Sequence, residues 1–174
     1  GLELDSMCAD LTIFAPGREL DDDGNILLQF KGGARGILTA SQILPGQENN
    51  LSIRVWGTEA GLLWRQENPN YLYVQTNDAP EQIYKRGNDY LCEAAQAGSR
   101  IPAGHPEAFI EAFANIYKNF SDALRAKMLG YEPDDIAWDF PKVEDGARGV
   151  HFIHKTVASS ASSVKWTPSE FTLA

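Results

Sequence analysis

Residues 51–66 read LSIRVWGTEAGLLWRQ, two short β-type runs on either side of a turn at residues 57–60. Successive side chains of a strand point to opposite faces, so Leu51, Ile53 and Val55 share one face of the first run. The stretch predicts a β-hairpin with one face in the core and one amphipathic face. The residues on the amphipathic face are Ser52, Arg54 and Trp56.

Further β-type runs flank this hairpin on both sides. Residues 31–34, Lys-Gly-Gly-Ala, fit a tight connection, because glycine supplies the positive φ that such turns require. The first half of the chain therefore predicts a mostly antiparallel sheet. Its expected strands are Ala9–Phe14, Ile26–Phe30, Arg35–Leu44, Leu51–Trp56, Gly61–Gln66, Tyr71–Gln75 and Gln82–Arg86.

The hydrophobic period changes after Pro106. Apolar residues recur there at helical spacing and predict a helix from Pro106 to Met128 that ends before Gly130. Glu107 in its first turn would complement the positive end of the helix dipole. If the stripe is buried, truncation of Phe113 to Ala should cost about 3 to 5 kcal/mol. The stripe consists of Phe109, Phe113, Ile116, Phe120 and Leu124.

A second helix is expected from Val143 to about Ser160, after the break at Phe140 and Pro141. Its glycines, Gly146 and Gly149, lower helix propensity but permit close approach to a neighbouring element. The side chains expected to point inward are Ala147, Val150, Ile153 and Val157.

Strands followed by helices indicate an α+β fold. We expect residues 1–174 to form a single domain, a largely antiparallel open-faced β-sheet with two long helices packed on one face. The other face, which carries residues such as Trp56, would be left open and would favour a partner.

Composition excludes several classes of function. The formal net charge is −9 with scattered Lys and Arg, which disfavours nucleic acid as a partner. No apolar run approaches the roughly 20 residues that span a bilayer. Cys8 and Cys92 have neither zinc-site spacing nor the density of a disulfide scaffold, so a reducing, cytoplasmic location is expected.

Common catalytic and metal-binding motifs are absent from the sequence. There is no G-x-G-x-x-G, G-x-S-x-G or H-E-x-x-H. His151 and His154 lie three residues apart on the second expected helix and could share a metal, although nothing completes the ligand set. The run Asp21–Asp23 lacks the alternating ligand spacing of a calcium loop, which favours a solvated turn.

His105 is the most interesting titratable residue. It is expected at the very start of the long helix, where the helix dipole opposes protonation of the imidazole. A neutral imidazole can donate or accept one hydrogen bond. The alternative is that His105 is simply a helix-start residue.

Several segments in succession resemble the C-terminal domain of the Gfo/Idh/MocA oxidoreductases, the family of glucose-fructose oxidoreductase and inositol dehydrogenase. The resemblance covers nearly the whole chain, in the family's order. The segments that carry it are Cys8–Leu11 with Pro16–Arg18, Gly36–Gln42 with Gly46–Asn49, Arg54–Trp64, Pro69–Leu72, Pro102–Glu107 with Phe113–Tyr117, and Phe140–Gly146 with Gly149 and Phe152–Ile153.

The resemblance implies a complete protein that moves hydride between NAD or NADP and a hydroxyl carbon of a sugar or polyol. The family's N-terminal Rossmann domain, with its Glu-Lys-Pro segment and catalytic lysine, has no counterpart in this sequence, and neither do its catalytic Asp and His. This chain alone should therefore be inert, with substrate-binding and oligomerisation roles. The substrate-binding residues that we expect are His105, Gln42, Asn49 and Arg18.

Two other hypotheses stay open. The chain could be a self-sufficient α+β binding or association module without chemistry of its own, or a zinc-dependent enzyme built around His151 and His154. Coding sequence upstream of Gly1 that contains G-x-G-x-x-G and Glu-Lys-Pro would support the oxidoreductase, and metal analysis tests the zinc enzyme.

Overall fold

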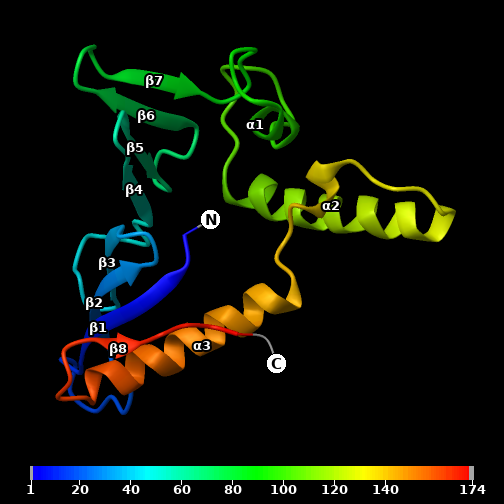
Figure 1. Ribbon diagram of the computed structural model, residues 1–174. Coiled ribbons are helices and arrows are strands. Elements are labelled where there is room, and N and C mark those ends of the chain that lie inside the picture. Colours follow the sequence, from blue (N-terminus) through cyan, green and yellow to red (C-terminus); the bar gives the residue numbers. More distant parts are fainter. Residues whose placement is uncertain (1, 173–174) are drawn as a thin grey trace. The chain divides into compact units, whose positions relative to one another are not determined.

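A computed structural model describes residues 2–172 of the chain (Figure 1). It divides into two compact units, Gly1–Gly46 with Pro141–Ala174, and Gln47–Phe140. In the described residues no helix is both long enough and apolar enough to cross a membrane. The α+β class is confirmed, as are the antiparallel strands and the two long helices.

The first unit contains an antiparallel sheet in the order β3-β2-β1-β8. The predicted connection between β2 and β3 is confirmed, since Gly32 and Gly33 have φ of 81° and 97°. The first expected strand begins earlier than predicted, at Leu4, because β1 pairs with β2 along its whole length. The strands are β1 (Leu4–Thr12), β2 (Asp23–Phe30), β3 (Arg35–Ser41) and β8 (Thr167–Pro168).

Helix α3 (Val143–Ser160) packs against β1 in the same unit (Figure 1). Met7 of β1 is fully buried, and Thr156 and Ser159 of α3 are buried with it. The prediction of the inward face was therefore wrong. The four residues that we expected to point inward lie on the exposed side of the helix: Ala147, Val150, Ile153 and Val157.

The reason is that backbone N–H groups at the edge of β1 require hydrogen-bond acceptors, which polar side chains of α3 supply and apolar ones could not. Strand β8 pairs with β1 only at Ser6 and Met7. Beyond that point the Ala9 N–H donates to Ser159 Oγ at 3.1 Å, and the Leu11 N–H donates to Ser160 Oγ at 2.9 Å. The serines at the end of α3 thus satisfy backbone groups that an edge strand would leave unpaired.

The second unit contains an antiparallel meander in the order β4-β5-β6-β7. The predicted hairpin is confirmed, with Ile53 opposite Trp64 and Val55 opposite Leu62. Within residues 2–172 the β-structure therefore forms two four-stranded sheets, where we expected one. The strands are β4 (Ser52–Trp56), β5 (Ala60–Arg65), β6 (Tyr71–Thr76) and β7 (Gln82–Lys85).

The expected core face of this hairpin is not buried. Leu51, Ile53 and Val55 share a face as predicted, but each is at least half exposed. Within the described residues, the long helix of this unit packs against a short 3-10 helix, η1 (Asp135–Trp138), and not extensively against a strand. The face of the sheet that carries Ile53 and Val55 is therefore not covered by a helix of this unit within the described residues.

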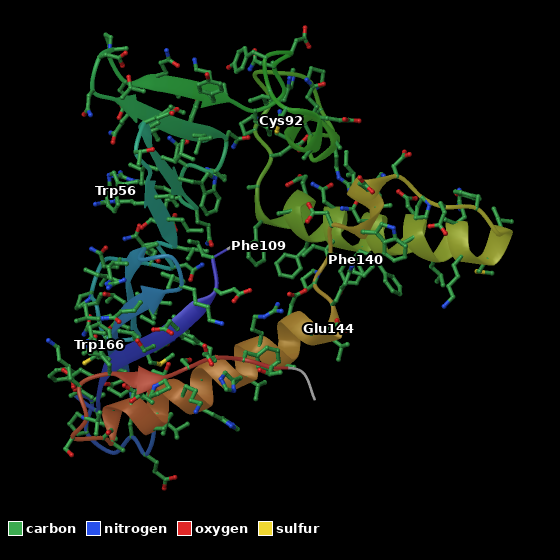
Figure 2. All side chains as sticks on the ribbon, in the orientation of Figure 1. Trp56, Cys92, Phe109, Phe140, Glu144 and Trp166 are labelled. Carbon is green, nitrogen blue, oxygen red and sulfur yellow. The ribbon has the colours of Figure 1, made fainter. Side chains whose placement is uncertain are left out.

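Helix α2 (Phe109–Leu129) confirms the long helix predicted from Pro106 to Met128, although it begins three residues later. Gly130 ends it with a φ of 75°. Its apolar stripe is only partly covered, however. Phe113 is 49% exposed, and the buried residues of the helix are instead Ala123 and Ala126. The ring of Phe140 packs edge-on against that of Phe120, with ring centroids 5.6 Å apart. Phe140 is labelled in Figure 2, as is Phe109 at the start of α2. A short helix that we did not predict, α1 (Glu93–Ala97), precedes α2.

Candidate functional site

A buried ion pair stands at the base of the segment that leads into α2. Arg86 Nη1 lies 3.2 Å from Glu107 Oε1, and only 14% and 4% of the two side chains are exposed. Asn70, directly before β6, joins them, because its Oδ1 accepts from the Glu107 N–H at 3.0 Å and from Arg86 Nε at 3.1 Å. We call Asn70, Arg86 and Glu107 the anchor triad.

The anchor triad fixes the backbone between residues 100 and 107. Arg86 donates to the carbonyl oxygens of Ile101 at 2.9 Å and Pro102 at 3.0 Å, and also to that of His105. Glu107 Oε1 in turn accepts the N–H groups of Arg100 at 2.7 Å and Ile101 at 2.6 Å. The planar guanidinium suits this arrangement, because its donors point in several fixed directions at once.

Asn115 of α2 ties the start of the same segment to the helix. Its Nδ2 donates to the Gly98 carbonyl oxygen at 2.8 Å, and its Oδ1 accepts from Arg100 Nε at 3.0 Å. Gly87 allows the close approach, since a Cβ there would lie 3.1 Å from the Ala103 nitrogen. The segment is thus held at both ends and cannot shift without breaking charged hydrogen bonds.

His105 lies on this segment with its side chain exposed. It closes a turn, because its N–H donates to the Pro102 carbonyl oxygen at 3.3 Å and Gly104 has a φ of 84°. The prediction that His105 begins the long helix was wrong, since α2 begins at Phe109. His105 therefore lies outside the first turn of α2, where the helix dipole acts.

We had expected Glu107 at the N-terminus of α2, but the acidic residue that accepts a hydrogen bond there is Glu111. Glu111 Oε2 accepts the Ala108 N–H at 2.9 Å. This bond favours the charged carboxylate and lowers the pKa of Glu111 below its usual value. Glu107 lies before the helix, where it holds Arg86 and the turn that carries His105.

Arg18 and Gln42, in the first unit, both contact the buried Asp22. Its carboxylate accepts the N–H groups of Phe14 and Ala15, each at 2.8 Å, which lowers the pKa of Asp22. Arg18 Nε lies 3.8 Å from Asp22 Oδ2, and the Gln42 N–H donates to the Asp22 carbonyl oxygen at 2.8 Å. Asp22 is therefore a buried turn residue, where we had expected a solvated one.

Asn49 is exposed in the second unit, on a loop before β4. Its neighbour Asn50 orders that loop by donating to Gln47 Oε1 at 2.6 Å. The four expected site residues thus divide between the units, with Arg18 and Gln42 gathered around Asp22 in one, and Asn49 and His105 in the other.

Sequence reasoning did not identify the anchor triad as a unit. Asn70, Arg86 and Glu107 are far apart along the chain, and no local motif connects them. The one available signal was an acidic residue beside the Pro102–Pro106 turn, with an arginine at the end of the preceding strand.

The candidate metal ligands do not form a cluster. Among residues 2–172 no group of three or more His, Cys, Asp or Glu side chains is placed to hold a metal ion. His151 instead stacks near Phe171, with ring centroids 5.3 Å apart, while His154 is exposed.

Residues 1–63 match the GFO/IDH/MocA C-terminal domain family. Over 168 residues the chain is 30% identical to the uncharacterized oxidoreductase YfiI of Bacillus subtilis (strain 168), covering 95% of this chain and 42% of that protein. The recognition of the family from sequence is confirmed.

Solved structures agree over nearly the whole chain. An oxidoreductase from Sinorhizobium meliloti is 40% identical, with a TM-score of 0.89, over 95% of this chain and 46% of its own. An inositol dehydrogenase homolog from Azotobacter vinelandii, complexed with NADH and myo-inositol, is 30% identical, with a TM-score of 0.85, over 96% of this chain and 44% of its own. The chain spans less than half the length of each relative. Over residues 1–63 the chain is similar to the C-terminal domain of the GFO/IDH/MocA oxidoreductases.

Proposed function

We propose that this chain is the substrate-binding and association domain of an NAD- or NADP-dependent oxidoreductase that acts on a sugar, a polyol or a related hydroxy compound. The observation that carries the proposal is the anchor triad, which holds the turn bearing the exposed His105 in one conformation. A rigid scaffold that presents an exposed imidazole is what selective binding of hydroxyl groups needs. The Azotobacter vinelandii relative supports the substrate class, because it was solved with NADH and myo-inositol.

We propose that this chain does not itself supply the nucleotide site. Its richest glycine cluster, Gly32–Gly36, forms the β2–β3 connection, whereas a phosphate-binding loop opens a helix. We therefore propose that a separate Rossmann domain binds the cofactor and that the catalytic lysine is outside this chain. The residues of this chain would bind and orient the substrate, with His105 contacting its hydroxyl groups, while the roles of Asn49, Gln42 and Arg18 stay predictions from the sequence.

His105 is the residue on which this function can be tested. In the longer protein that joins this chain to a nucleotide-binding domain, His105→Ala should lower kcat/KM for its polyol substrate by about tenfold, through loss of a hydrogen bond that strengthens in the transition state. His154→Ala, a change of the other exposed histidine, should leave kcat/KM within about twofold. Equal effects of the two changes would contradict a substrate role for His105.

We also propose that the domain forms homo-oligomers through the face of the β4–β7 sheet that carries Trp56. Trp56 on this face is 72% exposed (Figure 2), and Ile83 on the same face is 46% exposed. In sedimentation experiments Ile83→Lys should lower the mass of the assembly, and Ile53→Lys on the opposite face is the control. An unchanged mass for Ile83→Lys would contradict this interface.

The second candidate function is a stand-alone binding or association module without catalysis. The many exposed apolar residues of α2 and of the β4–β7 sheet favour it, because they suit protein contacts. Coding sequence upstream of Gly1 distinguishes the two: G-x-G-x-x-G and Glu-Lys-Pro there support the oxidoreductase, and a start codon directly before Leu2 supports the module. For either function we propose a cytoplasmic location, consistent with Cys8 and Cys92 both being free.

A further inference from the structure

One side of helix α2 is apolar and exposed along nearly its whole length. Its large side chains recur every three or four residues and are 45% to 69% exposed. The rings of the first two, Phe109 and Phe113, have centroids 4.8 Å apart, so the surface is continuous there. We call this side the α2 apolar face, and its residues are Phe109, Phe113, Tyr117, Phe120 and Leu124.

The other sides of α2 need no further covering. On one side Ala123 is buried, and Asn119 Nδ2 donates to the Asp139 carbonyl oxygen, directly after η1, at 3.0 Å. A second side is polar and exposed, since Lys118 Nζ lies 2.6 Å from Asp122 Oδ2. Solvent suits the polar side, whereas an apolar stripe of a helix is ordinarily covered by another layer of protein.

The α2 apolar face begins next to the proposed polyol site. Phe109 (Figure 2) follows His105 by four residues, so their Cα atoms are at most about 14 Å apart. Glu107 of the anchor triad holds the backbone between them. Hydride transfer requires the reacting atoms to approach to about 3 to 3.5 Å. A lobe that brings a nicotinamide to a polyol at His105 must therefore come close to this end of α2.

We propose that the α2 apolar face is the surface on which the cofactor-binding lobe of the longer protein docks. The choice of occupant rests on the proposed function, because only hydride transfer requires that lobe beside His105. The solved relatives, of which this chain spans less than half, are long enough to contain such a lobe. A second copy of this chain in the same place would keep the lobe away from the polyol.

The dimensions of the face suit an interface between two lobes of one chain. A helix of 21 residues is about 32 Å long. Interfaces between domains of one chain bury about 600 to 1,500 Å², with apolar and aromatic side chains at their centre. The phenylalanines would form that centre, and the exposed pair of Lys118 and Asp122 would stay in solvent.

Hydroxyl-radical footprinting of the 174-residue chain and of the longer protein tests the proposal without any substitution. Phe113 and Phe120 should be modified at least about tenfold more slowly in the longer protein, because the centre of an interface excludes water. Leu129 is the control, since it is 71% exposed and about 160° from Phe113 around the helix. Its modification should change by less than about twofold.

Three outcomes of the footprinting would overturn the proposal. The first is unchanged modification of Phe113 and Phe120, and the second is equal protection of Leu129. The third is protection of Phe113 in the 174-residue chain that increases with concentration, which would assign the face to a second copy.

A pair of variants of the longer protein provides a second test. Phe113→Asp should restore the modification of Phe120 to its rate in the 174-residue chain, because an unpaired carboxylate is costly to bury against apolar groups. Ser121→Asp adds the same charge at an exposed position off the face and should leave Phe120 protected. Continued protection of Phe120 in Phe113→Asp would overturn the proposal.

Oxidation of a polyol by the unsubstituted longer protein tests the proposed function separately, because footprinting does not depend on turnover. Protection of Phe113 without polyol oxidation would support the docking surface and contradict the proposed function. Polyol oxidation without protection of Phe113 would overturn the docking surface alone.

Discussion

Glu107 Oε1 lies 3.2 Å from Arg86 Nη1 and also accepts the N–H groups of Arg100 and Ile101. One buried carboxylate therefore holds both a strand-end arginine and the backbone that leads to His105. The exposed imidazole of His105 thus lies on a loop whose backbone is held in place by these hydrogen bonds.

Removal of the carboxylate should be costly. Glu107→Ala leaves Arg86 buried without its partner, and we expect it to lower the free energy of unfolding by about 3 to 5 kcal/mol. Asp122→Ala breaks the exposed pair with Lys118 and should cost less than about 1 kcal/mol. Urea unfolding measures both, and similar losses would contradict a special role for the buried pair.

The hydroxyl of Ser159 should matter more than its size suggests. Ser159→Ala removes the acceptor of the Ala9 N–H, and we expect a cost of about 1 to 3 kcal/mol with faster hydrogen exchange at that amide. Ser163→Ala is the control. Unchanged protection of the Ala9 amide would show that water or another group replaces the serine.

The first unit should lose stability in acid through Asp22. The folded-state pKa of Asp22 lies below its ordinary value of 3.8, chiefly because the N–H groups of Phe14 and Ala15 stabilise the carboxylate. Its contribution is therefore present above pH 3.8 and is lost as the pH falls through the folded pKa. Asp22→Asn should flatten this part of the stability profile, and an unchanged profile would contradict the assignment.

The stripe on α2 should contribute only part of what a buried stripe would. Phe113 is 49% exposed, so Phe113→Ala should cost about 1.5 to 2.5 kcal/mol, half the value for a fully buried ring. Ile110→Ala, at a position 79% exposed, should cost less than about 0.5 kcal/mol. A loss above about 3 kcal/mol for Phe113→Ala would mean that another surface covers the ring.

Local patterns in the sequence predicted most of the secondary structure. Three of these patterns involve only residues close together along the chain. They are the alternation in residues 51–56, the glycine pair at 32 and 33, and the helical stripe that begins at Phe109. What covers each face depends on distant residues. Ile53 and Val55 share a face as predicted, yet both are exposed. The side of α3 that packs on β1 is determined by hydrogen bonds from the edge of β1 to Ser159 and Ser160.

The candidate site was harder to predict for the same reason. His105 was singled out from an expected helix start that the structure does not have, and its site role stays a prediction. Asn70, Arg86 and Glu107 meet only after the chain has folded. Asp22 likewise reads as one of three exposed acids in sequence, and only the folded turn shows that it is buried.

The central claim is that this domain positions a sugar or polyol for hydride transfer to a cofactor bound elsewhere. The most direct measurement is NADH or NADPH absorbance with a panel of sugars and polyols, for the 174-residue chain and for the longer protein that joins it to a Rossmann domain. We expect reduction of the cofactor by the longer protein and none by the chain alone. Reduction by the chain alone, or none by the longer protein with any of these substrates, would contradict the account.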